Sequence, residues 1–340
     1  MVHQPNIEVG PRIAFLEVTS KCSLKCKHCI NNNYDGKDLC LDDIHSILKK
    51  IRQGGVRLIK FTGGEPFDRD DFEQIAFQCE DIGLKYIIYS NGINLGFDWL
   101  DSLSNLDSIR VSFDGYKKTH DYIRGEGNFD IVFQNLINSV RAHPNIRFVV
   151  NYTVNAQNYN QIEDFDRLLS EYDLDVSINI GFVKYAGRAI GQDGLLFSQE
   201  QAKSVYLKVQ QELIQCIHID KFSMLSDFYL ENYFAAFGCP AARETIYIAR
   251  NGDVYPCGMF KGNKKFYCGN LTCESLDLIL LSDTIKRMRF LTSMPKRCMH
   301  CDAYQKVCTG GCRGNAYNTL NGLCGLDPNC IFYNISKPIV

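Results

Sequence analysis

Residues 17–29 read Glu17-Val-Thr-Ser-Lys-Cys22-Ser-Leu-Lys-Cys26-Lys-His-Cys29, directly after the apolar run Ile13-Ala-Phe-Leu16. Iron–sulfur clusters are held by cysteine thiolates in short runs of this kind. Three thiolates can bind three irons of a [4Fe–4S] cluster, which leaves the fourth iron open for another molecule. The alternative is half of a zinc site with His28 as a ligand, although zinc sites usually combine four ligands from paired Cys or Cys/His knuckles.

Composition narrows the classes of protein to consider. The 340 residues carry a formal net charge of −2 and are 45% hydrophobic, which is ordinary for a globular protein. The sequence has no basic patch for nucleic acid, no signal peptide and no apolar run long enough to span a membrane. We therefore expect a cytoplasmic protein with no nucleic-acid or membrane partner. In that compartment, sixteen cysteines are more often metal ligands or catalytic groups than disulfides.

Predicted strands and helices alternate through the first half of the chain. The strands are 13–18, 56–62, 84–90, 108–113, 146–154 and 174–182, and the helices are 41–53, 70–83, 129–141 and 161–171. This alternation predicts parallel βαβ units, and polar clusters follow the strand ends, where α/β barrels place their active sites. We predict an α/β fold: a partial (β/α)6 TIM-like barrel over 1–197, a helical linker over 198–238 and a small cysteine-rich domain over 239–340.

The cysteine triplet after the first predicted strand resembles the signature of the radical S-adenosylmethionine (SAM) superfamily. The resemblance implies that Cys22, Cys26 and Cys29 hold a [4Fe–4S] cluster whose open iron binds SAM. One electron from the reduced cluster would cleave SAM to a 5′-deoxyadenosyl radical, which removes a hydrogen atom from the substrate. The cofactors would carry this chemistry, while the protein binds and orients them.

Gly63-Gly64-Glu65-Pro66 follows the second predicted strand and matches the superfamily motif that contacts the methionine amino group of SAM. Two glycines allow close backbone approach, and Glu65 suits an ammonium. The resemblance implies further SAM contacts after later strands, each with an ordinary turn or surface residue as the alternative: Ser90, Asn91, Ser112, Asn155 and Arg188. Asp114 is expected to face the cavity, whereas Asp121 and Arg124 could equally form a structural pair.

Ten of the sixteen cysteines lie between Cys239 and Cys330. Their spacing resembles the SPASM domain, which binds two auxiliary iron–sulfur clusters, with six residues between Cys301 and Cys308 where five is usual. The resemblance implies one ligand set of Cys239, Cys257 and Cys312, and another of Cys298, Cys301, Cys308 and Cys330. The first set is one ligand short, so Cys268, Cys273 or Cys324 completes it, or the cluster has an open iron or is [2Fe–2S]. A zinc ribbon is the alternative for Cys298 to Cys312. Cys40, Cys79 and Cys216 are most simply buried small apolar residues.

SPASM enzymes often act on peptides, and an electron count suggests why they carry extra clusters. A substrate radical that closes a bond or forms a double bond must lose one more electron, which an auxiliary cluster can accept. The leading hypothesis is therefore an oxidative crosslink or side-chain oxidation of a ribosomally synthesised peptide. The expected partners are a reductant such as flavodoxin or ferredoxin and a separate leader-peptide-binding protein, because the residues before the first strand are too few for a docking domain.

Other functions stay open at this point. One is a dehydrogenase or epimerase of a sugar or aminocyclitol in natural-product biosynthesis, and in an epimerase Cys216 could return a hydrogen atom. Asp114 is the other candidate catalytic residue. A sulfatase-maturing role is disfavoured because those relatives carry Asp directly after the cysteine equivalent to Cys257, where this chain has Gly258. A non-enzymatic iron–sulfur carrier or zinc-stabilised binding module would need neither the barrel nor Gly63-Gly-Glu-Pro66.

Overall fold

The structure is a computed structural model that describes residues 10–31, 37–198, 200–201, 204–205, 239–290, 295–301, 310–320, 322–328 and 330. Cys216, Cys308 and most of the predicted helical linker lie outside the described residues.

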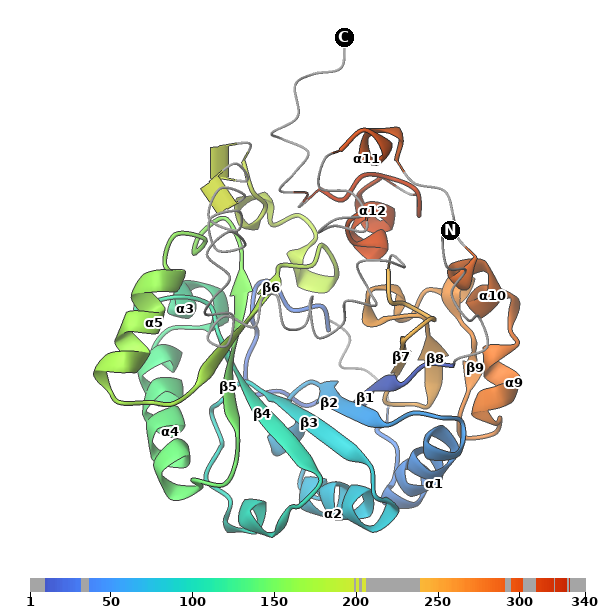
Figure 1. The fold of residues 1–340 in the computed structure, drawn as a ribbon, viewed down its shortest axis with the longest axis horizontal. Coiled ribbons are helices and arrows are strands. Elements are labelled where there is room, and N and C mark those ends of the chain that lie inside the picture. Colours follow the sequence, from blue (N-terminus) through green and yellow to red (C-terminus); the bar gives the residue numbers. More distant parts are fainter. Residues whose placement is uncertain are drawn as a thin grey trace, which may run out of the picture.

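Six parallel strands form the larger part of one sheet (Figure 1). They are β1 (Ile13–Thr19), β2 (Leu58–Gly63), β3 (Lys85–Ser90), β4 (Leu106–Phe113), β5 (Phe148–Val154) and β6 (Ser177–Phe182), and each pairs in parallel with the next. Parallel strands are covered on both faces and are therefore rich in apolar residues. Leu16, Phe61 and Ile88 are fully buried in this way. All six predicted strands are confirmed.

Helices cover the outer face of this sheet, as Figure 1 shows. They are α1 (Leu41–Gln53), α2 (Phe72–Ile82), α3 (Lys117–Arg124), α4 (Asn128–Ala142) and α5 (Ile162–Glu171). In α1, the buried residues Ile44, Ile47, Leu48 and Ile51 recur at the spacing of one helix face. Short 3-10 turns lie at Pro66–Asp68, Asp98–Ser102, Gly187–Ala189 and Asp193–Leu195. The four predicted helices are confirmed, but α3 was not predicted, because its residues Lys-Lys-Thr-His-Asp-Tyr-Ile-Arg are mostly polar.

The cysteine-rich segment continues the same sheet. Its strands are β7 (Thr245–Ile248), β8 (Asp253–Tyr255) and β9 (Gly269–Asn270), and the sheet order is β6-β5-β4-β3-β2-β1-β7-β8-β9. β7 pairs in parallel with β1, so that Leu16 lies opposite Ile248, and β8 and β9 follow in antiparallel pairing. The helices here are α9 (Leu276–Leu280), α10 (Asp283–Arg289), α11 (Lys296–Met299) and α12 (Arg313–Leu320), with 3-10 turns at Gly258–Phe260 and Lys264–Phe266.

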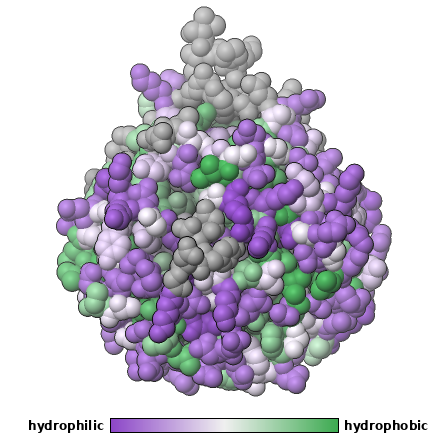
Figure 2. Space-filling view, turned by 180° about the vertical axis from the view of Figure 1, so that it is seen from behind, coloured by the Kyte–Doolittle hydropathy of each residue, from purple (hydrophilic) through white to green (hydrophobic). Residues whose placement is uncertain are grey.

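The described strands form an open sheet with β6 and β9 at its two ends, which confirms the predicted α/β fold with an incomplete barrel. Hydrophilic residues predominate on the face shown in Figure 2, and hydrophobic residues are scattered among them. No helix in the described ranges is both long and apolar enough to cross a membrane.

Candidate cofactor site at the carboxyl edge of the sheet

The loop after β1 carries three free thiols, of which Cys26 is buried and Cys22 and Cys29 are half-buried. Cys22 Sγ accepts hydrogen bonds from the backbone N–H of Leu24 at 3.5 Å and from Asn91 Nδ2 at 3.8 Å. Arg124 Nη1 lies 3.9 Å from Cys26 Sγ. Burial raises the pKa of Cys22 to about 11 and also raises that of Cys26. N–H donors aimed at sulfur favour the thiolate form, so this donor set fits a group that binds thiolates.

Across the part of the chain that the structure describes, no three His, Cys, Asp or Glu side chains converge on a single metal ion. An iron–sulfur cluster does not require the three thiols to converge on one point, because each thiolate binds a different iron.

Gly63 and Gly64 let the loop after β2 lie directly on the residues that precede Cys22. Gly64 N–H donates to Thr19 O and Glu65 N–H donates to Lys21 O, both at 2.7 Å. A Cβ on Gly64 would lie 1.9 Å from Lys21 O, and one on Gly63 would lie 2.4 Å from Thr19 O. Gly63 also has φ +131°, which favours glycine. The close approach therefore requires glycine at both positions.

Glu65 is buried and joins the ends of β2 and β3. Its Oε1 accepts from the N–H of Phe67 at 3.2 Å, and its Oε2 accepts from the N–H of Asn91 at 2.5 Å. Burial raises the pKa of Glu65 to about 7. Since both oxygens already accept backbone N–H groups, an ammonium ligand would have to share them. Pro66 begins the 3-10 turn that follows, Ser90 Oγ accepts from Gly92 N–H at 3.0 Å, and Ser112 is half-buried on β4.

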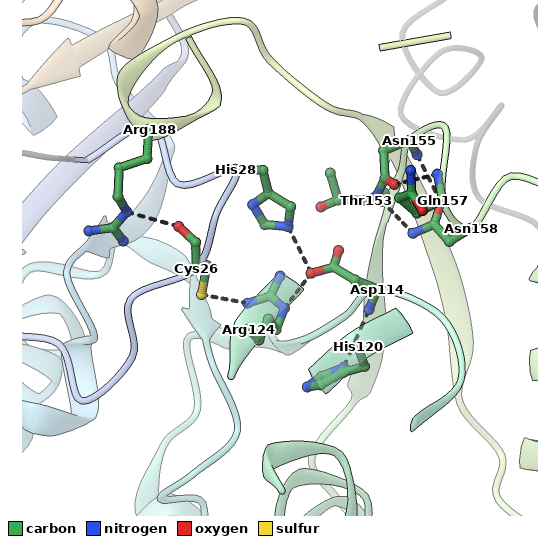
Figure 3. A network of polar contacts seen from close by, with 10 residues as sticks. All are labelled: Cys26, His28, Asp114, His120, Arg124, Thr153, Asn155, Gln157, Asn158 and Arg188. Carbon is green, nitrogen blue, oxygen red and sulfur yellow. Dashed lines mark hydrogen bonds and ion pairs between the residues drawn. The ribbon is translucent and has the colours of Figure 1, made fainter. Parts of the chain in front are cut away.

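Asp114 follows β4 and is completely buried, with Arg124 and His28 as its partners (Figure 3). Its Oδ2 lies 2.7 Å from His28 Nε2 and accepts from Arg124 Nε at 2.6 Å. Burial alone would raise the pKa of Asp114, but Arg124 and His28 hold it well below its usual range. Its backbone N–H donates to His120 Nδ1 at 3.4 Å, and burial lowers the pKa of His120 to about 4.

Three consecutive residues at the end of α3 support the cysteine loop. Lys27 Nζ lies 3.2 Å from the centre of the Tyr122 ring, Lys27 N–H donates to Ile123 O at 2.8 Å, and Arg124 reaches Cys26. Asp121 has a different partner, because its Oδ1 accepts from the N–H of Phe129 at the start of α4. Arg124 therefore pairs with Asp114 rather than with Asp121.

Arg188 approaches the same loop from the segment after β6 (Figure 3). Its Nε donates to Cys26 O at 2.8 Å, and its backbone N–H donates to Cys29 O at 2.9 Å. Gly187 has φ +57°, and a Cβ there would lie 2.5 Å from Cys29 O. Arg188 is thus anchored on the cysteine loop and is not a surface arginine.

Asn155 is also buried, but its side chain closes a local turn. Its Oδ1 accepts from Gln157 N–H at 2.9 Å, and its Nδ2 donates to Thr153 O at 3.1 Å. Figure 3 shows this group apart from the contacts of Asp114.

Lys261, from the cysteine-rich segment, forms a polar connection that the sequence did not predict. Its Nζ donates to Glu17 Oε1 at 2.9 Å and to Asn31 Oδ1 at 2.7 Å. Asn31 Nδ2 in turn donates to Gly63 O. The buried Tyr247 hydroxyl on β7 faces Glu17 and Asn31. The sequence signal that could have indicated this connection is Glu17, a charged residue inside an otherwise apolar strand.

A second thiol group consists of Cys239, Cys257 and Cys312. These three act on one another electrostatically, and burial raises the pKa of Cys239 and Cys257. The ammonium of Lys184, after β6, lies among them, and its pKa is raised chiefly by Cys312. Lys184 is exposed.

Hydrogen bonds through Asn315 of α12 connect the segment after β6 to Cys312. The N–H of Tyr185 donates to Asn315 Oδ1 at 2.8 Å, Asn315 Nδ2 donates to Asp327 Oδ1 at 3.0 Å, and Cys312 N–H donates to Asp327 Oδ2 at 2.7 Å.

The candidates for a fourth ligand lie elsewhere. Cys268 is buried with its Sγ donating to Phe266 O at 3.4 Å, and burial raises its pKa to about 12, with Ser282 and Arg287 as the other influences. Cys273 and Cys324 are exposed. Of the other predicted set, Cys298 is buried and Cys301 and Cys330 are half-buried. Of the remaining cysteines, Cys79 is buried as expected, whereas Cys40 is exposed.

Two regions of the chain match family models. Residues 16–169 match the family model of the radical SAM superfamily, and residues 239–302 match that of SPASM, an iron–sulfur cluster-binding domain. Mycofactocin maturase MftC of Mycolicibacterium smegmatis is 27% identical over 93% of this chain and 81% of its own length. The AdoMet-dependent heme synthase of Methanosarcina barkeri is 24% identical over 95% and 97%, and the PqqA peptide cyclase of Bradyrhizobium diazoefficiens is 23% identical over 97% and 88%.

Solved structures share the fold. Streptococcus suis SuiB bound to precursor peptide SuiA has a TM-score of 0.73 at 19% identity, covering 95% of this chain and 76% of that chain. Native anSMEcpe with bound AdoMet and Cp18Cys peptide has a TM-score of 0.76 at 17% identity, covering 95% and 94%. The chain therefore contains a radical SAM superfamily domain at residues 16–169 and a SPASM iron–sulfur cluster-binding domain at residues 239–302.

Proposed function

We propose that this protein uses SAM to oxidise a ribosomally synthesised peptide, by a crosslink or a side-chain oxidation. The observation that carries the proposal is the position of the second thiol group against the first. Gly258, directly after Cys257, packs on Ile30, directly after Cys29, and a Cβ on Gly258 would lie 3.5 Å from Ile30 Cδ1. An electron acceptor held by Cys257 would therefore lie close to the loop of the first thiols.

Cys22, Cys26 and Cys29 would hold the [4Fe–4S] cluster that binds SAM. When bound, the cluster and SAM supply the radical that takes a hydrogen atom from the substrate. The protein holds the loop in place from several sides: Gly64 and Glu65 on Thr19 and Lys21, α3 on Lys27, and Arg188 on Cys26. We assign contacts with SAM to the backbone of Gly63-Gly64 and to Asn91, whose side chain also reaches Ser23 Oγ at 3.2 Å.

Cys239, Cys257 and Cys312 would hold the nearer auxiliary cluster, and Cys298, Cys301, Cys308 and Cys330 the farther one. The nearer set has three thiols and the ammonium of Lys184. Three protein ligands suit a [4Fe–4S] cluster with an open iron or a smaller [2Fe–2S] cluster. Lys184 would balance part of the negative charge that the three thiolates bring to this site.

A peptide substrate has support from the relatives. The relative from Mycolicibacterium smegmatis is named a maturase, and that from Bradyrhizobium diazoefficiens a peptide cyclase. A sulfatase-maturing role has less support from the site. An Asp in place of Gly258 would need room at a position where the added Cβ alone would lie 3.0 Å from the Tyr247 ring.

A tetrapyrrole is the second candidate substrate. Relatives named AdoMet-dependent heme synthase in two organisms are 24% and 25% identical over nearly the whole chain. These identities are close to the 27% of the maturase, so identity alone does not separate the two substrate classes.

The test uses anaerobically reconstituted, dithionite-reduced protein with SAM and either the peptide encoded beside its gene or an iron coproporphyrin. We expect 5′-deoxyadenosine, together with a peptide that has lost two hydrogen atoms. The control is Cys26→Ala, which should form neither. Deoxyadenosine with an unchanged peptide and a decarboxylated porphyrin would replace the peptide proposal with the tetrapyrrole one.

A further inference from the structure

Arg124 connects the first thiol group to a buried countercharge. Its side chain is 7% exposed, its Nε donates to Asp114 Oδ2 at 2.6 Å, and its Nη1 lies 3.9 Å from Cys26 Sγ. Figure 3 shows the guanidinium between the sulfur and the carboxylate. Arg124 thus contacts the thiol of Cys26 and the carboxylate of Asp114 through two edges of its planar guanidinium.

Arg188 is the other cation beside Cys26. Its Nε donates to the backbone oxygen of Cys26, and its charge, like that of Arg124, acts to lower the pKa of that thiol. His28 contacts the same oxygen, Asp114 Oδ2, and approaches it from above in the view of Figure 3, whereas Arg124 approaches it from below. Asp114 Oδ1 has no hydrogen-bond partner and is buried, so the charge of the carboxylate is compensated chiefly by the Arg124 guanidinium on Oδ2.

We propose that Arg124, balanced by Asp114, sets the reduction potential of the cluster held by Cys22, Cys26 and Cys29. This inference rests on the proposed cluster at those thiols. Taking up one electron from a flavodoxin-type or chemical reductant adds negative charge to the cluster. A cation beside Cys26 stabilises that charge, and the carboxylate behind the cation weakens its effect.

The proposal predicts shifts of opposite sign. Arg124→Gln removes the cation and leaves Asp114, so the potential becomes more negative. Asp114→Asn leaves the cation without its countercharge, so the potential becomes more positive. Each change should alter the reduction equilibrium by roughly tenfold, which corresponds to about 59 mV for one electron. A purely structural role would disturb the loop in both variants and would not give opposite signs.

The experiment is a potentiometric titration of the full-length holoprotein, followed by EPR. The cluster in question is identified as the one whose signal changes when SAM is added, which separates it from the auxiliary clusters. Arg124→Lys keeps the charge and should stay near the wild-type potential, which separates loss of the charge from a disturbance of the loop. Arg167→Gln is the matched control, because Arg167 lies on α5 with a side chain that is 68% exposed.

Opposite shifts in the Gln and Asn variants, with an unchanged Arg167 variant, would support the proposal. A SAM-responsive signal whose potential is the same in all variants, or moves in one direction in both, would overturn this inference alone. Absence of any SAM-responsive signal from the wild-type protein would overturn the proposed function as well.

Discussion

The ammonium of Lys261 lies 2.9 Å from the carboxylate of Glu17, a residue 244 positions earlier in the chain. Glu17 is 1% exposed and lies on β1, whereas Lys261 lies between β8 and β9 of the cysteine-rich segment. This ion pair and the pairing of β7 with β1 join the two halves of the molecule at the same strand. Because Lys261 also contacts Asn31, the pair lies directly beside the loop of the first thiols.

Removing one partner of a buried ion pair leaves an uncompensated charge, at a cost of about 3 kcal/mol or more. We therefore expect Lys261→Met to lower the free energy of unfolding by about this amount. The double variant Glu17→Gln with Lys261→Met should recover part of the loss. Denaturant unfolding under anaerobic conditions measures both, with the exposed Lys264→Met as the control. A single variant as stable as the wild type would contradict the structural role of this pair.

Gly64 gives a second prediction, because a Cβ there would lie 1.9 Å from a backbone oxygen, Lys21 O. The Lys21 carbonyl oxygen cannot move aside as the end of a flexible side chain can. Gly64→Ala must therefore displace the residues just before Cys22. We expect reconstituted Gly64→Ala protein to bind less iron and to lose SAM cleavage. The matched control is Gly96→Ala, where nothing lies within 4 Å of the added Cβ and φ is not in the left-handed region. Equal iron content in the two variants would show that the loop accommodates the methyl group.

The sequence was informative where local pattern and strand order decide the structure. The six parallel strands and the loops after them were predicted because apolar runs alternate with amphipathic helices. The polar residues at the carboxyl edge followed from the same pattern. Contacts of side chains across that edge could not be predicted, since they depend on rotamers and loop paths. Arg124 is the example: its spacing to Asp121 suggested a local pair, yet it reaches across to Asp114 and Cys26.

The sequence also did not predict that β7 extends the sheet. Thr245-Ile-Tyr-Ile248 is a short apolar run whose partner, β1, lies more than two hundred residues away. Its pairing is set by tertiary packing, which pattern alone does not specify.

The second thiol group gives a third prediction, about its missing ligand. Cys268 faces Phe266, Ser282 and Arg287, and Cys273 and Cys324 are exposed. We expect Cys268→Ala and Cys273→Ser to keep the full iron content of the reconstituted protein. Cys257→Ala should lose about four irons, or about two if the cluster is [2Fe–2S]. Iron analysis together with Mössbauer spectra distinguishes these cases. Loss of a cluster in the Cys268 variant would identify it as the fourth ligand after all.

His120 gives the last prediction, which concerns pH. Burial lowers its pKa from 6.5 to about 4, so the unfolded chain binds more protons than the folded one between these values. The contribution of neutral His120 to stability is therefore complete above pH 6.5 and is lost as the pH falls toward 4. Between pH 7.5 and 5 the loss amounts to about 2 kcal/mol.

His120→Asn removes the titrating group, and the Asn oxygen can still accept the N–H of Asp114 that His120 Nδ1 accepts. We expect this variant to lose about 2 kcal/mol less than the wild type over the same pH range, whatever its stability at pH 7.5. The titration of Asp114 does not affect this comparison of pH slopes, because its pKa in the folded protein lies well below the pH range used. Unfolding curves at several pH values measure the two slopes, and identical slopes would mean that another group controls the acid sensitivity.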